Sequence, residues 1–282
     1  MDILLTGATG NVGKEVAREL RVMGVPFRVG TVKPGKIVQI DANMEIRRFD
    51  FLDPTTFEGA FDGIKHLFLV RPPALADVPK ELAPAIRAAV AAGVQHIVFL
   101  SLQGVENNRV TPHYKIEQLI LELGVRYTFL RASFFMQNLS TTSAHEIKTL
   151  SEIRLPVGKA KTSFIDVRDI AAVAARALTD SAHENQKYTL TGGEALDYFQ
   201  VAEKLSAALN RPIRYTHPSV ITFVIRQLAE GKALGYSLVV AALYTITRFG
   251  NAKEVTGTVE ALLGRPPITF DQFARDNRAV WE

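Results

Sequence analysis

Short apolar runs alternate with segments of helical periodicity through the first half of the chain. Alternation of β-rich runs with amphipathic helices is typical of βαβ units, in which crossover helices join parallel strands. The pattern therefore predicts an α/β fold with a doubly wound parallel sheet of the Rossmann type. The expected strands are Asp2–Thr6, Phe27–Val32, Glu45–Phe49, His66–Val70, Gln95–Ser101 and Arg126–Leu130, and the expected helices are Val12–Met23, Pro79–Ala92 and Tyr114–Leu123.

The pattern changes after about residue 133. Helical segments then predominate, with short strand-like pieces at Lys187–Leu190 and Ile213–Thr216. The capped helical pattern of Asp166–Leu178 is expected to pack on the sheet of the first domain. We expect a small, mostly helical C-terminal lobe that covers the substrate at the carboxyl ends of the strands, where such sheets bind ligands. The predicted ranges are 1–150 for the Rossmann domain, 160–180 for a segment returning to it, and 181–282 for the substrate lobe.

A glycine-rich turn, Gly7-Ala8-Thr9-Gly10-Asn11-Val12-Gly13, lies directly between the first expected strand and the first expected helix. In such a turn the first glycine allows the tight bend, the second lets the backbone approach a pyrophosphate, and the third lets helix and strand pack closely. The free N–H groups of the helix N-terminus then face the phosphates. The turn predicts dinucleotide binding through Gly7, Thr9, Gly10, Asn11, Val12 and Gly13.

The residues after the second expected strand distinguish the two nicotinamide dinucleotides. NAD sites usually place Asp or Glu there to hold the ribose hydroxyls, and Gly30–Lys36 contains no acid. Lys33 or Lys36 would attract a 2′-phosphate, whereas a carboxylate would repel it. NADP is therefore the expected cofactor, with NAD as the other possibility. Simple surface solvation is the alternative role for both lysines.

The composition excludes several other function classes. The 282 residues carry a formal net charge of +4, and the basic residues are scattered, so the sequence has no basic stripe for nucleic acid. The chain has no cysteine, which rules out disulfides, thiolate metal sites and cysteine nucleophiles. The 6 histidines include no pair at i, i+4, so no metal site is expected.

The sequence predicts no targeting or membrane segment. Its start has Asp2 where a signal peptide would be positively charged. The apolar run Leu238–Ile246 is shorter than the roughly 20 residues that span a bilayer, and Lys232 and Arg248 flank it. We therefore expect a buried helix there. We also expect a cytoplasmic protein that binds a small apolar substrate, with a second copy or another protein as further partners.

Several further segments follow one another in a characteristic order. Together with the Thr6–Gly13 turn, they make the sequence similar to the NmrA-like group of atypical short-chain dehydrogenases/reductases. That group includes NADPH:quinone reductase-like and triphenylmethane reductase-like proteins. The segments are Phe49-Asp50-Phe51, Ser101–Gly104, His113–Glu117, Tyr127–Asn138, Phe164–Ala171 and Leu263–Pro267, followed by Phe270 and Phe273.

The resemblance implies roles for residues outside the glycine turn. Asp50 and Phe51 would flank the adenine, and Val70 and Arg71 would line the path of the ribose and phosphates. The three residues that begin at Ser133 would lie beside the nicotinamide. The expected cofactor residues beyond the turn are Lys33, Asp50, Phe51, Val70, Arg71, Ser101, Ser133, Phe134 and Phe135.

Several of these residues have a structural alternative to a functional role. Asp50 could equally cap the turn before Pro54. Arg131 ends a strand at the functional edge, but a buried ion pair with Asp166 or Asp169 would explain it as well. Aromatic residues that could line an apolar substrate pocket, or pack as plain core, are Phe134, Phe135, Phe223, Tyr236 and Tyr244.

The catalytic pattern of the wider superfamily, Tyr-x-x-x-Lys, is absent, because no tyrosine has a lysine four residues later. In that pattern the tyrosine donates a proton as hydride arrives. Lys115 has Thr111, not a tyrosine, four residues before it. The resemblance instead implies a His-x-x-x-Glu pattern, which His113 and Glu117 match. His113, Tyr114 and Lys115 are the candidate catalytic residues. Their respective alternatives are helix packing, an aromatic cleft wall and a solvated lysine.

The resulting hypothesis is an enzyme, an NAD(P)H-dependent reductase that transfers hydride to an apolar, quinone-like acceptor. Such a transfer needs little beyond proximity and orientation, so it tolerates the missing tyrosine, and solvent or His113 could supply the proton. The alternative is a non-catalytic NAD(P)-binding redox sensor or regulator of the NmrA type. A third reading, a sugar-nucleotide epimerase-like enzyme, would be expected to keep the tyrosine and ranks last.

Overall fold

The computed structural model describes residues 1–36, 42–248, 250 and 252–282. The chain forms two compact units: unit 1 consists of residues 1–132 and 167–190, and unit 2 of residues 133–166 and 191–282. Two side chains named above lie outside the described residues. They are Lys36, expected to attract a 2′-phosphate, and Tyr236, expected near an apolar substrate.

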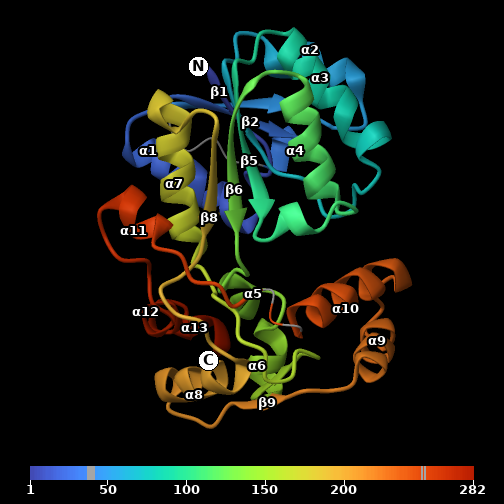
Figure 1. Cartoon of the computed structure of the whole chain (residues 1–282), viewed down its shortest axis with the longest axis vertical. Helices are drawn as coiled ribbons and strands as arrows, with labels where there is room; N and C mark the ends of the chain where they lie inside the picture. The colour runs from blue at the N-terminus through green and yellow to red at the C-terminus, as the bar shows by residue number, and fades with distance from the viewer. Residues whose placement is uncertain (37–41, 249, 251) are drawn as a thin grey trace. The chain divides into compact units, whose positions relative to one another are not determined.

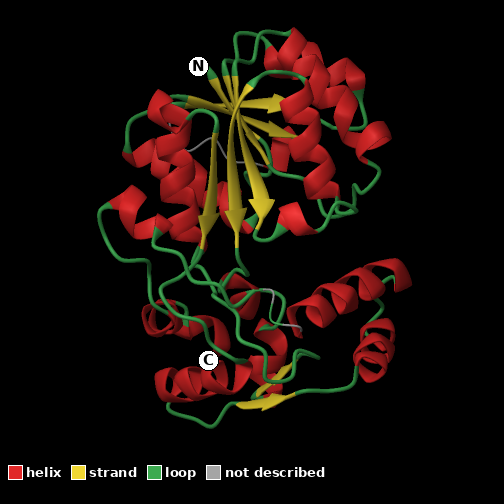
Figure 2. Cartoon of the chain, viewed as in Figure 1, coloured by secondary structure: helices red, strands yellow, loops and turns green. Residues whose placement is uncertain are grey.

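Seven parallel strands form the sheet of unit 1, in the order β3-β2-β1-β4-β5-β6-β8 (Figure 2). β1 pairs with β2 on one side and with β4 on the other, so the strand order reverses there, as in doubly wound sheets. The predicted Rossmann fold is confirmed. The strands are β1 Ile3–Leu5, β2 Phe27–Thr31, β3 Met44–Arg48, β4 His66–Leu69, β5 His96–Leu102, β6 Arg126–Ala132 and β8 Gln186–Leu190.

Helices cover both faces of this sheet (Figure 1). α1 and α7 lie side by side on one face, and α2, α3 and α4 lie on the other. In α1 the apolar residues Val12, Val16 and Leu20 recur at helical spacing, and all three are buried. The helices are α1 Asn11–Val22, α2 Phe57–Phe61, α3 Ala83–Ala91, α4 Pro112–Glu122 and α7 Val167–Thr179.

Phenylalanine side chains dominate the packing after β3. The ring of Phe49 packs edge-to-face on Phe51 and Phe61, with ring centroids 4.8 and 5.4 Å apart, and all three rings are buried. Large aromatic side chains bury much apolar area each, so this cluster fixes the loop that follows β3. The residues expected near the adenine belong to this loop.

The unit boundaries differ from the predicted domain ranges. β8 pairs with β6 in the sheet of unit 1, whereas the sequence pattern predicts these residues in the C-terminal lobe. β8 is an edge strand in which only Leu190 is buried, so its hydrophobic signal is weak. Conversely, residues 133–150 belong to unit 2, because Met136 and Ile147 pack in its core.

Unit 2 is mostly helical around its own core. The indole of Trp281 is buried there and donates to the carbonyl oxygen of Leu139 over 3.0 Å, which ties the C-terminal helix to the segment after β6. β7 and β9 form a small parallel sheet. The elements are α5 Gln137–Ser140, α6 Ala144–Leu150, β7 Glu152–Arg154, α8 Tyr198–Leu209, β9 Arg214–Thr216, α9 Val220–Ala229, α10 Leu234–Arg248, α11 Thr258–Leu263, α12 Phe270–Asp276 and α13 Arg278–Trp281.

The prediction of a buried helix over the apolar run of α10 is wrong. Leu238, Val239 and Leu243 are 52%, 62% and 45% exposed. The helix buries small residues, among them Ser237 and Ala241, and packs Val240 partly against the core, while Leu238, Val239 and Leu243 face outward. Because the run is apolar on every face, the sequence does not reveal which face packs. In the described part of the chain, no helix combines the length and the apolar character needed to cross a membrane.

Candidate cofactor site

Backbone crowding explains the glycines of the turn between β1 and α1. Gly7 has a φ of +66°, and a Cβ placed on it would lie 3.0 Å from the Cβ of Val70. A Cβ on Gly13 would lie 2.2 Å from the carbonyl oxygen of Gly7, far inside van der Waals contact. The N–H of Gly10 donates to the same carbonyl over 2.9 Å. The turn therefore closes on itself and leaves no room for side chains at Gly7 and Gly13.

The N-terminus of α1 is open toward an anion. Among the described residues, no side chain caps the helix at Gly10, and its first turn contains no acid. Thr9 and Gly10 are exposed and Asn11 is half-buried, whereas the side chain of Val12 is buried. Uncapped N–H groups and the positive end of the helix dipole attract phosphate. The geometry fits a diphosphate, to which Val12 could offer only its main chain.

Lys33 lies just after β2 and is exposed. Its main-chain N–H donates to the hydroxyl of Thr31 over 3.3 Å, while its ammonium has no partner within the described ranges. An unpaired cation at this position is free to bind a 2′-phosphate, as the preference for NADP requires.

In the loop after β3, both Asp50 and Phe51 have structural roles. A carboxylate oxygen of Asp50 accepts from the N–H of Leu52 over 3.0 Å, which closes a local turn. This bond bears out the structural alternative for Asp50, a capping acid before Pro54, while Asp53 caps the short helix that begins at Pro54. Phe51 is 8% exposed and belongs to the aromatic cluster. Contact of either residue with adenine stays a prediction.

The ends of β1 and β4 are fastened together beside the glycine turn. The hydroxyl of Thr6 donates to the carbonyl of Phe68 over 3.0 Å and accepts from the N–H of Val70 over 2.8 Å. Nη1 of Arg71 donates to the carbonyls of the loop that follows, including that of Leu75 at 2.8 Å. Burial lowers the pKa of Arg71, and its Nε has no acceptor among the described residues. The guanidinium thus rigidifies this loop and keeps one donor unused.

The three candidate catalytic residues lie in the first turn of α4. The ring of His113 stacks on Phe99, with centroids 6.0 Å apart. Burial, and then the charge of Arg71, lower the pKa of His113 to about 3, so its imidazole is neutral at neutral pH. Tyr114 is half-buried and Lys115 is exposed. Successive helical residues point about 100° apart, so the three side chains leave the helix in different directions, and their part in catalysis stays a prediction.

Ser101 and Glu117 belong to a buried network that the sequence does not reveal. The hydroxyl of Ser101 donates to the carboxylate of Glu117 over 2.6 Å. Nε and Nη2 of Arg131 donate to the same carboxylate over 3.1 and 2.7 Å. Glu106 binds Arg131 from outside at 3.0 Å. Burial opposes the charge of Arg131, but the bond to Glu117 and the two acids outweigh it and raise its pKa.

This network corrects the expected partners of Arg131. They are Glu117 and Glu106, not Asp166 or Asp169. The acids lie on α4 and on the turn before it, and the parallel pairing of β5 with β6 brings that region beside Arg131. A glutamate four residues after His113 was the only sequence signal, and it pointed toward catalysis instead of an ion pair.

Ser133, Phe134 and Phe135 open unit 2. The hydroxyl of Ser133 accepts from that of Ser163 over 3.1 Å, and both are buried. The ring of Phe134 stacks on Tyr244 of α10 at 6.4 Å, and Phe223 of α9 packs edge-on against Tyr244 at 5.8 Å. Three of the aromatic residues singled out in the sequence therefore form one cluster.

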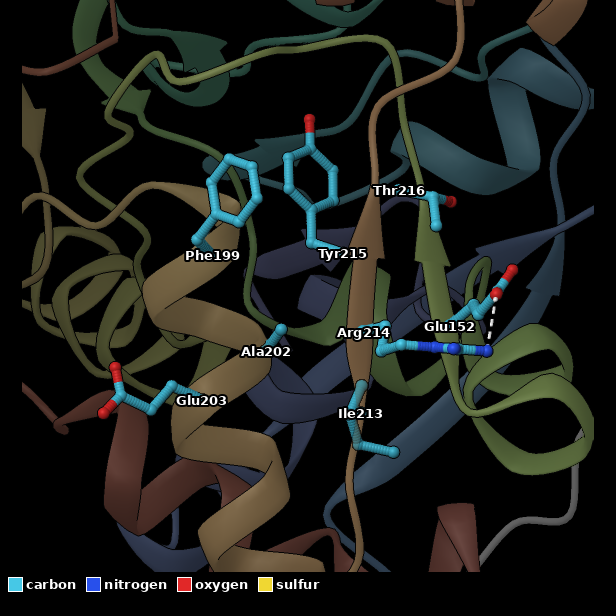
Figure 3. A pocket seen from close by; sticks show the side chains of 8 residues that line it. All are labelled: Glu152, Phe199, Ala202, Glu203, Ile213, Arg214, Tyr215 and Thr216. Atoms are coloured by element: carbon cyan, nitrogen blue, oxygen red, sulfur yellow. Dashed lines mark hydrogen bonds and ion pairs between the residues drawn. The ribbon is translucent and has the colours of Figure 1, made fainter.

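Unit 2 also contains two cavities that no local sequence motif predicts. The first, of about 530 Å³, lies between α8 and the small sheet (Figure 3). There Arg214 already pairs with Glu152 at 3.4 Å, and burial raises the pKa of Tyr215 to about 12. The second, of about 490 Å³, is lined by Gly158, Lys159, Ala160, His217 and Arg248. Within the described ranges, no group of three or more His, Cys, Asp or Glu side chains could hold a metal ion.

A parallel sheet that reverses its order at β1, with a crowded glycine turn leading into an uncapped helix, defines a dinucleotide-binding Rossmann protein. Comparison with known proteins narrows this class. The NmrA-like family model matches residues 1–262, so the chain belongs to the NmrA-like family.

Similar proteins include several reductases. NAD(P)H azoreductase from Xenophilus azovorans is 35% identical over 286 residues, which cover 99% of each chain. An NADPH-dependent quinone oxidoreductase from Escherichia coli, solved with NADPH, superposes with a TM-score of 0.86 at 25% identity, over 97% of this chain and 99% of that one. Triphenylmethane reductase from Citrobacter sp., complexed with NADP(H), shares the fold with a TM-score of 0.85 at 22% identity, over 98% and 100%. The predicted resemblance and the predicted class, an NmrA-like oxidoreductase, are confirmed.

Proposed function

We propose that this protein is an NADPH-dependent reductase that passes hydride to an apolar, quinone-like acceptor. The observation that carries the proposal is the uncapped N-terminus of α1 at the glycine turn, in a chain whose relatives include NAD(P)H-dependent reductases. When bound, a reduced nicotinamide supplies hydride. The work left to the chain is to bind, orient and shield the reactants.

Each part of the dinucleotide has a proposed contact. The main-chain N–H groups at the start of α1 hold the diphosphate, and Lys33 holds the 2′-phosphate. The family pattern supplies the rest: Asp50 and Phe51 at the adenine, Val70 and Arg71 along the ribose and phosphates, and Ser133, Phe134 and Phe135 at the nicotinamide.

We assign the proton of the reaction to water. His113 has a pKa of about 3, so it offers no imidazolium at neutral pH, and Lys115, two residues further along the helix, is exposed to solvent. A quinone that accepts hydride becomes a hydroquinone anion, which water protonates without a positioned acid. His113 then serves as a neutral, stacked group that shapes the site.

The test is direct. The purified full chain is mixed with NADPH and a panel of quinones, and loss of the reduced-cofactor absorbance is followed. Oxidation that depends on both protein and quinone supports the proposal. Calorimetry without acceptor measures binding separately, and no heat with NADPH or NADH would overturn the proposed role.

A redox sensor that binds NAD(P) without turnover is the second candidate. The observation favouring it is that the sequence lacks Tyr-x-x-x-Lys and that burial keeps His113 neutral at neutral pH. Tight NADPH binding together with no oxidation across the whole quinone panel would favour the sensor over the reductase.

A further inference from the structure

The second cavity of unit 2 is lined by basic residues and by no acidic residue among the described ones. Lys159, His217 and Arg248 border it with Gly158 and Ala160, and no acid lines it among the described residues. All three basic side chains are exposed, and none has an ion pair or side-chain hydrogen bond within the described ranges. A cavity bordered by unpaired basic groups concentrates anions.

The other arginines of unit 2 each have at least one side-chain partner, which makes Arg248 unusual. Arg211 donates to the carbonyls of Ile147 and Trp281 at 2.9 and 3.0 Å. Arg226 donates to the carbonyl of Arg154 at 2.8 Å. Arg248 ends α10 with its guanidinium uncommitted, so its charge is available to a ligand.

The fold brings Arg248 close to the loop that carries Lys159. Gly158 has a φ of +69°, and a Cβ placed on it would lie 3.5 Å from Nε of Arg248. The hydroxyl of Tyr215 donates to the carbonyl of Leu155 over 2.9 Å, which holds the start of the same loop. Three segments far apart in sequence thus present their basic groups to one cavity.

An aromatic cluster lies on the same helix. Tyr244 precedes Arg248 by four residues, so the two side chains lie on one face of α10, about 5–6 Å apart at Cβ. Tyr244 stacks on Phe134, which the family pattern assigns to the nicotinamide. Arg248 is therefore one helical turn from Tyr244, whose ring stacks on Phe134, the residue proposed to lie beside the reacting ring.

We propose that this cavity binds an anionic substituent of the hydride acceptor, so that the substrate class is an aromatic acceptor bearing a sulfonate, carboxylate or phosphate. The proposal rests on the reductase function stated above. The acceptor ring gains hydride from NADPH and a proton from water, and the anionic group is unchanged. Arg248 makes the main charge-assisted contact, supported by Lys159.

The test compares two acceptors, a naphthoquinone and the same naphthoquinone bearing a sulfonate. Arg248→Gln should raise the KM for the sulfonated acceptor about tenfold relative to the KM for the neutral one, with kcat little changed. Lys159→Gln should give a smaller shift in the same direction, and Arg248→Lys should recover part of the loss because it keeps the charge. Added salt should raise only the KM for the sulfonated acceptor.

The matched control is Arg214→Gln, which removes an arginine from the other cavity of the same unit. Its KM ratio for the two acceptors should equal that of the unchanged protein. If both acceptors are reduced and Arg248→Gln leaves the ratio of their KM values unchanged, the anion site is wrong. The proposed reductase function would not be affected by that result.

Failure of both acceptors to be reduced would instead reject the reductase. Calorimetry with the naphthoquinone sulfonate and no cofactor then decides the anion site. Binding that Arg248→Gln weakens and Arg214→Gln does not would support it, and absence of binding to the unchanged protein would reject it.

Discussion

Units 1 and 2 gather their chemical groups in different ways. In unit 1 the glycine turn is seven consecutive residues, and its shape follows from contacts within the turn and with Val70, which directly follows the neighbouring strand β4. In unit 2 the basic cavity draws on Gly158–Ala160, His217 and Arg248. A local group can be recognised in the sequence, whereas a group assembled from distant segments depends on tertiary packing.

The two units also treat their charges differently. Arg131 of unit 1 is enclosed by Glu117 and Glu106, and burial favours such closed pairs. Arg248 of unit 2 has no acid beside it within the described ranges. An unpaired cation attracts anions. The difference separates a buried ion pair that belongs to the fold from a cation that is proposed to bind a ligand.

The largest expected effect breaks the closed pair of unit 1. Glu117→Ala leaves the guanidinium of Arg131 buried without its main partner, and Ser101 loses its acceptor. Losing one member of a buried pair costs about 3–5 kcal/mol of unfolding free energy. Urea unfolding measures it. Glu122→Ala, on the exposed end of α4, is the control and should cost less than about 0.5 kcal/mol. Equal losses in the two variants would contradict this account of the network.

Acid should weaken unit 1 before unit 2. Burial, then the charges of His66 and Arg126, lower the pKa of His96 to about 4. The unfolded chain keeps the ordinary value of about 6.5, so it takes up the proton first. The contribution of His96 to stability is therefore lost as the pH falls below about 6.5, and this loss is complete near pH 4, up to about 3 kcal/mol.

Hydrogen exchange at several pH values, read separately for each unit, measures this effect. His96→Gln should reduce the acid dependence of unit 1 but not abolish it, because the pKa of His113 is also lowered, whereas His145→Gln, at an exposed position of α6, should change little. An identical acid response in unit 1 of the two variants would reject His96 as the source.

A third pair of changes compares the tightest backbone approach in each unit. A Cβ on Gly13 would lie 2.2 Å from the carbonyl oxygen of Gly7, and one on Gly192 would lie 2.1 Å from that of Phe164. Gly13→Ala and Gly192→Ala should each cost about 1–3 kcal/mol of unfolding free energy. Only Gly13→Ala should also weaken NADPH binding, by more than about tenfold.

Gly59→Ala is the control for both, because a Cβ at that helical position meets nothing within 4 Å. It should leave NADPH affinity unchanged and stabilise the fold by up to about 1 kcal/mol. Urea unfolding and calorimetry give the two readouts. If Gly192→Ala lowered NADPH affinity as much as Gly13→Ala does, the proposal that only the glycine turn of unit 1 affects cofactor binding would be wrong.

The smallest expected effect concerns cofactor choice. Lys33→Glu replaces the unpaired cation after β2 with a carboxylate, which repels a 2′-phosphate. NADPH affinity should fall about tenfold while NADH affinity changes little. Lys148→Glu, at an exposed position in unit 2, is the control. If the unsubstituted protein bound NADPH and NADH with equal affinity, the predicted preference for NADPH would be wrong.

Sequence patterns predicted unit 1 well because its signals are local. Strand runs, the glycine turn and the amphipathic face of α1 each occupy a few consecutive residues. The misses have physical causes. The edge strand β8 buries only Leu190, so it gave little signal. The partners of Arg131 depend on how α4 packs beside β5 and β6, which its own neighbours in sequence do not encode.

Prediction was weaker for unit 2. The apolar sequence of α10 indicated burial, but the helix packs through Ser237 and Ala241 and leaves Val239 outside. Small side chains allow close packing that a hydrophobicity pattern does not register. Arg248 was noticed only as the end of an apolar run, because its cavity depends on a loop ninety residues earlier.

The position of Trp281 has a practical consequence. It is the only tryptophan of the chain, and it is buried in unit 2. Its fluorescence therefore reports the opening of unit 2, whereas far-ultraviolet circular dichroism sums the helices and strands of both units. Superimposable melting curves from the two signals would indicate a single cooperative transition, and separated curves would give the order in which the units melt.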